Sequence, residues 1–288
     1  MAAREIPVAR PAASFAVRRI AGALGAEVAG LDLSRDLAAD TVAGLRRALL
    51  DHLVIFFRDQ ALTPDRFLAV ARLFGEPADY PFLQGIPGHP KIIRVAKLEG
   101  ETANFGGIWH TDTAYLDAPP MGTLLLAEQV PPFGGDTLFA NQYLAYEALS
   151  PGMRRMLDGL RAEHSSAKAA VSATRADRIR EAGTAAEPPA YRAEHPVVRT
   201  HPETGRRSLY VNTAHTIRFA GMTEAESAPL LDYLFRHQVA PEFTCRFSWT
   251  PGALAFWDNR ATLHNPVNDY HGHRRTALRI TLAGDRPA

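Results

Sequence analysis

The sequence has a single cysteine, Cys245, among its 288 residues. One cysteine cannot form an internal disulfide, and it excludes a zinc site built mainly from thiolates. Because disulfide-poor chains are typical of reducing compartments, we expect the protein in the cytoplasm. An excess of either charge is also missing, since 32 basic and 31 acidic side chains give a formal net charge of +1. This balance gives no electrostatic reason to expect nucleic acid or an anionic membrane as a partner.

Long apolar runs are missing as well. No stretch approaches the roughly 18 apolar residues of a membrane-spanning helix. Residues 1–11 mix arginine, glutamate and proline and lack the apolar centre of a signal peptide. The composition, 46% hydrophobic and 22% charged, is ordinary for a globular protein, and no change in composition marks a boundary. We therefore expect one domain over residues 1–288.

Most of the regular structure expected from the sequence is short strands. Apolar runs and period-two alternation predict strands at 14–20, 26–33, 53–57, 91–98, 122–130, 136–139, 196–200 and 208–212, and again between 243 and 282. Helical spacing predicts helices over 40–52, 63–74, 144–164 in two pieces, and from a capping box at 223–226 onward. Asp40 is the expected cap of the first helix. These elements predict a mainly β fold, a sandwich or barrel with flanking helices.

Residues 165–190 differ from the rest of the chain. They are rich in alanine, arginine, serine, threonine and proline and have almost no large apolar side chains. The segment is too polar for a core and is expected to be a polar lid or loop. A functional lid and a surface loop without contact to any site are equally open.

The pattern His-x-Asp at His110 and Asp112 is the first indication of chemistry. It lies in a segment without helical periodicity, between two glycines and two prolines. If the segment is a strand, side chains two residues apart project from the same face and converge. One imidazole and one carboxylate supply two of the three ligands of a 2-His-1-carboxylate site for non-haem Fe(II).

The third ligand has to be found among the remaining histidines. We expect His52 and His237 at helix ends, and His89, His201, His271 and His273 in solvated turns. His164 and His195 flank the polar excursion formed by residues 165–190. His215 follows a strand and could line a pocket. His264 comes shortly after the apolar strand 253–257 and is the best candidate because of the strand that follows it.

That last strand, 275–282, has two different faces. Thr276, Leu278, Ile280 and Leu282 share an apolar face, whereas the other face carries Arg275 and Arg279 with an alanine between them. If the arginine face is buried, both guanidinium groups need anionic partners. A carboxylate is the natural partner of arginine, which can grip it with two hydrogen bonds. A solvent-facing edge strand is the alternative.

Together these motifs resemble one family closely. They are His110-x-Asp112, Gly134-Gly135-Asp136-Thr137, Trp257-Asp258-Asn259-Arg260, His264 and Arg275-x-x-x-Arg279, with VIFFRDQ at 54–60 and HPVVRTHP at 195–202. Their order and spacing over residues 26–286 are similar to those of the taurine dioxygenase (TauD/TfdA) family of Fe(II)/2-oxoglutarate-dependent oxygenases.

The resemblance implies a double-stranded β-helix, or jelly-roll, with His110, Asp112 and His264 as the catalytic Fe(II) ligands. It also implies that Thr137 and Arg275 bind the distal carboxylate of the co-substrate 2-oxoglutarate. Arg279 would face the primary substrate or the inner end of the same pocket. The implied reaction uses O2 to hydroxylate a small organic acid, with decarboxylation of 2-oxoglutarate to succinate and CO2. A homodimer or homotetramer is implied too.

The substrate pocket is expected to be more apolar than that of taurine-specific members. Its expected walls are Tyr80, Leu83, Phe105, Tyr115 and His215, with Arg279 for an anion. These residues disfavour taurine and favour a larger sulfonate, sulfate ester, aryloxy acid or other carboxylate. Two alternatives stay open: a hydrolase or isomerase of cupin type with another metal in the triad, and a non-catalytic binding protein on the same scaffold. The cupin-type chemistry has no need of the 2-oxoglutarate clamp formed by Arg275 and Thr137, and a binding protein should have lost at least one metal ligand, whereas none is missing here.

Overall fold

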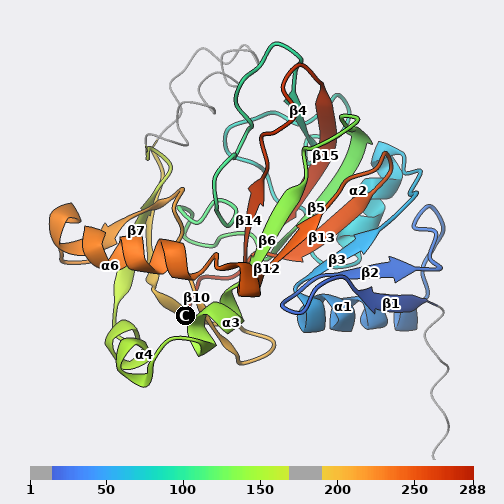
Figure 1. Cartoon of the computed structure of the whole chain (residues 1–288). Helices are drawn as coiled ribbons and strands as arrows, with labels where there is room; N and C mark the ends of the chain where they lie inside the picture. Colours follow the sequence, from blue (N-terminus) through green and yellow to red (C-terminus); the bar gives the residue numbers. More distant parts are fainter. Residues whose placement is uncertain (1–14, 169–189) are drawn as a thin grey trace, which may run out of the picture.

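The computed structural model describes residues 15–168 and 190–288, and its largest element is a seven-stranded sheet (Figure 1). The strand order is β1 (Ala16–Arg19), β2 (Ala26–Ala29), β3 (Val54–Phe57), β13 (Leu254–Asp258), β5 (Gly122–Gln129), β15 (Arg275–Leu282) and β4 (Ile93–Lys97). All neighbours are antiparallel except β2 and β3, which run parallel. The sheet therefore brings the last strand of the chain between β5 and β4.

A second sheet of three strands packs on one face of the first. It consists of β12 (Thr244–Phe247), β6 (Thr137–Asn141) and β14 (Thr262–Pro266). Aromatic rings from both sheets meet in the space between them: Phe56 of β3 stacks on Phe247 of β12 with ring centroids 3.9 Å apart. Phe139 of β6 contacts the same Phe56 ring edge-on, at 5.7 Å. The His264 ring on β14 lies 4.8 Å from the Trp257 ring of β13 and 6.2 Å from the Phe139 ring of β6, so it packs against both sheets.

Two helices cover the other face of the large sheet, α1 (Ala39–His52) and α2 (Pro64–Arg72). Leu45 and Leu49 of α1 and Phe67 of α2 lie in one buried cluster with Ile55 and Phe57 of β3. The run at 53–57 was expected to be buried on both faces, and β3 confirms this: alternate residues face the helices and the small sheet.

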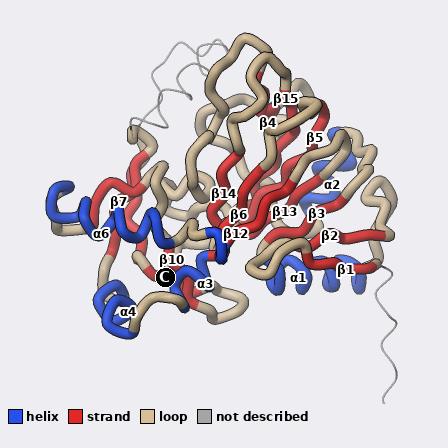
Figure 2. The backbone as a smooth tube through the Cα atoms, in the orientation of Figure 1, coloured by secondary structure: helices blue, strands red, loops and turns tan. Residues whose placement is uncertain are grey.

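The remaining elements form a separate group beside the two sheets (Figure 2). They are the sheet β11 (Thr216–Phe219), β7 (Arg161–Ser165) and β8 (Arg192–Pro196), the hairpin β9 (Val198–Thr200) and β10 (Arg207–Leu209), and α3 (Gln142–Glu147), α4 (Pro151–Leu157), α6 (Glu224–His237) and η1 (Pro241–Phe243). Their apolar side chains make a third buried cluster around Phe219 and Leu234.

The expectation of a mainly β fold with flanking helices is confirmed, with three local corrections. The expected cap Asp40 lies in the first turn of α1, and Ala38 occupies the cap position without a side-chain hydrogen bond. Helix was expected up to residue 164, but 161–165 form β7. The strands β8 and β11 were missed, because His195 of β8 and Thr216 of β11 supply buried positions that an apolar pattern does not reveal.

The capping box of α6 is confirmed, since Thr223 and Glu226 each accept a hydrogen bond from the other's backbone N–H. The polar excursion at 165–190 lies almost entirely outside the described residues, and the expectation of one domain stays a prediction. Among the described helices, none combines the length and the apolar character that crossing a membrane requires.

Candidate metal centre and its two cavities

His110, Asp112 and His264 come together although about 150 residues separate the first pair from the third. Their potential ligand atoms all lie within 4.8 Å of one another. His110 Nε2 lies 3.7 Å, and His264 Nε2 3.9 Å, from Asp112 Oδ1. Within residues 15–168 and 190–288, no other three histidine, cysteine or acidic side chains gather in this way.

The segment that carries His110 and Asp112 is not the expected strand. Only His110 pairs with another strand, through reciprocal backbone hydrogen bonds of 3.0 and 2.8 Å with His264 on β14. Asp112 lies in a turn, followed by Thr113 with a left-handed φ of 42°. Side-chain hydrogen bonds at Thr111 and Asp112 take the place of a β ladder here, and the turn itself brings the carboxylate toward the histidines.

A chain of hydrogen bonds holds the Asp112 carboxylate in place. Thr123 Oγ1 on β5 donates to Asp112 Oδ2 at 2.6 Å. Asn259 Nδ2 donates to Thr123 Oγ1, and Trp257 Nε1 donates to Asn259 Oδ1, both at 2.9 Å. Since Oδ2 is occupied by the hydroxyl, Oδ1 is left to face the two imidazoles. Thr123 was missed in the sequence, and the only signal for Asn259 was its place in the Trp257–Arg260 motif.

The protonation states of the three side chains suit a divalent cation. Burial lowers the pKa of His110 and, more strongly, of His264, so both imidazoles are neutral. Burial alone would raise the pKa of Asp112, but the charge of Arg279 and the hydrogen bond from Thr123 hold that pKa below its usual range. His110 Nδ1 lies 2.7 Å from the backbone oxygen of Ile108, which directs Nε2 to the centre. Two neutral imidazoles and a carboxylate form the donor set of a facial non-haem iron site.

Two cavities meet at this centre. The first has largely aromatic walls, from Tyr80, Phe105, Tyr115 and His215, with Arg279 at its inner end. All five are residues predicted for the substrate pocket, and the structure brings them together. Leu83, the sixth residue expected there, lines a different cavity formed by residues 79–90. The chain turns at residues 81–83, and there Leu83 lines the same cavity as Gln84 and Ile86.

The second cavity contains the expected co-substrate residues, Thr137 on β6 and Arg275 on β15, together with His264. Arg275 is only 8% exposed, its Nε has no hydrogen-bond partner among the described residues, and its guanidinium lies 5.3 Å from the centre of the Trp249 ring. Burial lowers the pKa of Arg275. A buried guanidinium without an anion is costly, so this cavity calls for a carboxylate.

Arg279 lines both cavities, as do His110, Asp112 and Phe105. Its Nη2 lies 2.8 Å from Asp112 Oδ1. The arginine face of β15 is thus buried, and the alternative of a solvent-facing edge strand is wrong.

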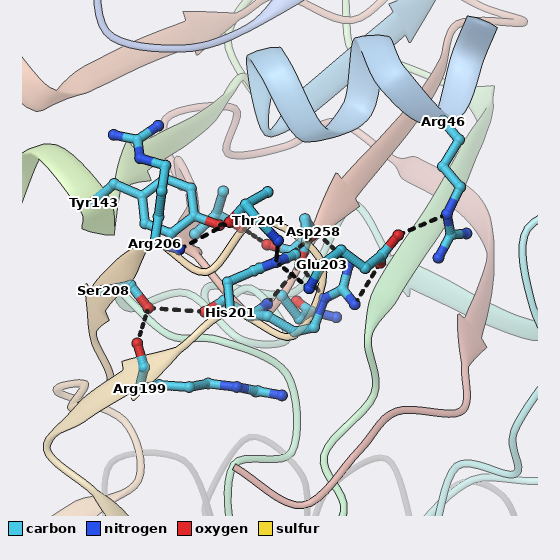
Figure 3. Close-up of polar contacts among 12 residues, drawn as sticks. Arg46, Tyr143, Arg199, His201, Glu203, Thr204, Arg206, Ser208 and Asp258 are labelled. Atoms are coloured by element: carbon cyan, nitrogen blue, oxygen red, sulfur yellow. Dashed lines mark hydrogen bonds and ion pairs between the residues drawn. The ribbon is translucent and has the colours of Figure 1, made fainter. Parts of the chain in front are cut away.

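The prediction of a solvated turn is wrong for one histidine, His201. His201 is 1% exposed, and its Nε2 lies 3.0 Å from Asp258 Oδ2, within the polar network drawn in Figure 3. The turn itself is present, but the packing of residues 201–206 against the end of β13 buries the ring. A turn pattern in the sequence does not show what the turn packs against.

Comparisons with known proteins agree with this geometry. The family model described as "Taurine catabolism dioxygenase TauD, TfdA family" matches residues 16–281. An alpha-ketoglutarate-dependent sulfate ester dioxygenase of Pseudomonas putida is 38% identical over 279 residues, which cover 94% of this chain and 90% of the relative. An alkylsulfatase of Acinetobacter baylyi is 35% identical over 285 residues, or 96% and 88% of the two chains. The crystal structure of a putative alpha-ketoglutarate-dependent taurine dioxygenase from Burkholderia xenovorans superimposes with a TM-score of 0.82 at 37% identity, over 96% of this chain and 94% of that chain.

Proposed function

Because this chain belongs to the taurine catabolism dioxygenase TauD, TfdA family, we propose that its primary substrate is an organic sulfate ester with an apolar alkyl or aryl body. The protein is an Fe(II)- and 2-oxoglutarate-dependent dioxygenase that hydroxylates a small organic acid. Two of its relatives are named for sulfate esters, and the observation that carries the choice is the combination of one buried arginine with aromatic walls in the first cavity.

His110, Asp112 and His264 are the proposed ligands of Fe(II). Their donor set and their charges support this assignment, and a deprotonated carboxylate between neutral imidazoles needs no further proton release to bind a cation. When bound, Fe(II) supplies O2 activation coupled to the decarboxylation of 2-oxoglutarate to succinate and CO2. The protein's part is to position both acids and to keep water out.

Thr137 and Arg275 are the proposed partners of the distal carboxylate of 2-oxoglutarate. Arg275 supplies a charge that no described side chain neutralises, and Thr137 supplies a hydroxyl whose oxygen already accepts a hydrogen bond from Trp249 Nε1 at 2.9 Å. That bond leaves the hydroxyl hydrogen available to the carboxylate.

Arg279 is the proposed partner of the sulfate group in the first cavity. Among the described residues, Asp112 is the one acidic side chain that lines the cavity, so they offer the primary amine of a substrate such as taurine no other anionic partner. Tyr80, Phe105 and Tyr115 would surround the apolar body and exclude water from the reacting carbon. Hydroxylation of the carbon that bears the ester oxygen gives an intermediate that collapses to an aldehyde, with release of inorganic sulfate.

We assign the two facing sheets to a double-stranded β-helix. The support is the packing of a mainly antiparallel sheet on a smaller antiparallel sheet. The small sheet carries the metal ligand His264, and the large sheet carries Thr123, which holds the ligand Asp112. We further expect a cytoplasmic homodimer or homotetramer, which size-exclusion chromatography with light scattering would test.

The test of the substrate is a matched series of anions. Hexyl sulfate, hexanesulfonate, hexanoate and taurine would each be supplied with Fe(II), 2-oxoglutarate and O2, and succinate, aldehyde and sulfate would be measured. We expect hexyl sulfate to give all three products in equal amounts and taurine to give only background succinate. Turnover of taurine at the rate of hexyl sulfate would contradict the proposal, as would succinate without sulfate release.

A further inference from the structure

A third cavity adjoins the co-substrate cavity. The two cavities share Val95, Phe105, Pro266 and Arg275 in their walls. The rest of the third cavity's lining comes from Ala96 and from polar residues, of which Lys97 carries the charge. Arg275 is thus the charged residue that lines both spaces.

Lys97 is a buried cation without an anionic partner among the described residues. Its side chain lies on β4 and the residue is 3% exposed, yet Nζ has no hydrogen bond or ion pair within the described part of the chain. The ammonium lies over the ring of Tyr270, 4.1 Å from its centre. The carboxylates of Glu101 and Asp269 act on it only from a distance, and burial lowers the pKa of Lys97 in spite of them. A lysine this buried is normally paired with an anion.

The register of the sheet places a second cation directly beside it. Lys97 is the cross-strand partner of Arg275 in the antiparallel pair of β4 and β15. Side chains of directly opposed residues lie on the same face, and like charges in that position repel. Within the described part of the chain neither group has an ion-pair partner, so an anion that contacts both would relieve the repulsion and the cost of burial together.

We propose that this third cavity extends the co-substrate cavity, and that Lys97 in it binds the distal carboxylate of 2-oxo dicarboxylic acids one methylene longer than 2-oxoglutarate. The proposal rests on the proposed role of Arg275. An acid of the length of 2-oxoglutarate would end at Arg275, whereas the longer acid would pass its carboxylate beyond that side chain and reach Lys97. Lys97 is thus a residue that determines which 2-oxo acids the enzyme accepts.

The experiment is a binding measurement without turnover. Anaerobic calorimetry on the Mn(II)-loaded protein would give dissociation constants for 2-oxoglutarate, 2-oxoadipate and 2-oxohexanoate, the last being the six-carbon acid without a distal carboxylate. In the wild type we expect 2-oxoadipate to bind at least about tenfold more tightly than 2-oxohexanoate, the ratio of one charge-assisted contact. Equal affinity for these two acids would overturn the proposal without any variant.

The variant Lys97→Met keeps most of the side-chain volume and removes the charge. We expect it to weaken 2-oxoadipate about tenfold or more and 2-oxoglutarate by less than about threefold. Arg94→Gln is the matched control, because Arg94 is an exposed cation on the same strand that pairs with Glu128, and it should change neither constant. An equal loss for both acids in Lys97→Met would contradict the extension. Failure of 2-oxoglutarate itself to bind the wild type would instead contradict the proposed co-substrate site.

Discussion

Single hydroxyl groups decide the geometry of the metal centre, and Thr123 is the clearest case. Its Oγ1 donates to one oxygen of Asp112 and accepts from Asn259, so the hydroxyl links the carboxylate to the turn that follows β13. Removing such a partner of a metal ligand typically weakens metal binding about 10–100-fold. We predict that Thr123→Val, of nearly equal volume, raises the dissociation constant for Fe(II) or Mn(II) about tenfold or more, measured by competition with a chelating dye.

Thr123→Ser is the matched control for this prediction. It keeps the hydroxyl and loses only the methyl group, so it should restore most of the metal affinity. A purely structural role would instead show equal losses in both variants, because both disturb the packing of a fully buried position.

Arg275 allows an equally direct test of the co-substrate site. Arg275→Ala removes a charge-assisted contact worth about 1.5–3 kcal/mol, which corresponds to about a 10–150-fold weaker binding of 2-oxoglutarate. The neighbouring Arg274 is exposed and pairs with Glu99, so Arg274→Ala should leave the binding unchanged. Anaerobic titration of the 2-oxoglutarate charge-transfer band would measure both, and an unchanged constant in Arg275→Ala would disprove the assignment.

The residues that the sequence could predict are those whose chemistry is visible without knowledge of their neighbours. His110, Asp112, His264 and the two arginines of β15 belong to motifs, and the structure brings them together. Thr123 lacks such a signal because a threonine in an apolar strand also fits ordinary packing. Lys97 was missed for the opposite reason, since a lysine in a strand is normally expected to face solvent.

At the scale of elements, the turn between β13 and β14 determines where His264 lies. Asp258 at its start accepts hydrogen bonds from the backbone and side chain of Arg260, at 2.6–2.9 Å, and lies 3.0 Å from His201 Nε2. Arg260 continues the network to Glu203, and Glu203 to Arg46 on α1 (Figure 3). The network joins the turn between β13 and β14, the 201–206 turn and the first helix, which are far apart in the sequence.

We predict that Asp258→Asn lowers the free energy of unfolding by about 3–5 kcal/mol, because it leaves the buried Arg260 with one carboxylate fewer. Urea denaturation would measure the loss. The same change in an exposed ion pair, Asp36→Asn beside Arg66, should cost no more than about 1 kcal/mol. Equal effects of the two substitutions would show that the network contributes little.

The pKa of Asp258 determines how the stability difference between the wild type and Asp258→Asn depends on pH. Burial would raise that pKa, but the hydrogen bonds from Arg260 and His201 outweigh burial and lower it. A lowered folded-state pKa means that the stabilisation is complete above the unfolded value of about 3.9 and is lost as the pH falls toward the folded value. The gap in stability between wild type and Asp258→Asn should therefore be constant from pH 5 to 7 and shrink below about pH 4.

The elements that the sequence predicted correctly have strong local signals. The buried run of β3 and the capping box of α6 are examples, and both confirm the expected boundaries within a few residues. The strands β7 and β8 have polar residues at buried positions, which an apolar pattern does not reveal. β7 also follows two helices closely, so the sequence predicts a continuation of helix there. Tertiary packing decides such segments.

At the scale of the whole molecule, the metal centre joins two parts of the chain whose backbones share a single residue pair. β14 is held in the small sheet by five consecutive residue pairs with β6. The segment 104–116 forms no strand, and its backbone is tied to β14 only by the single pair of His110 and His264. A bound cation would bond two side chains of this segment and one of β14, in the native state but not in the unfolded chain.

This difference predicts where removal of the metal is felt. Binding to the native state alone stabilises it by about 2.7 kcal/mol at a ligand concentration of 100 times the dissociation constant, so a chelator should lower the melting temperature. In hydrogen exchange the change should be local: amides of 104–116 should exchange faster without metal, whereas those of the central strands β5 and β13 should not change. His110→Ala is the control, since addition of metal should then protect neither region. Uniform protection of the whole chain by metal in the wild type would mean that the segment is already fixed by its packing, and that the centre is assembled before the cation binds.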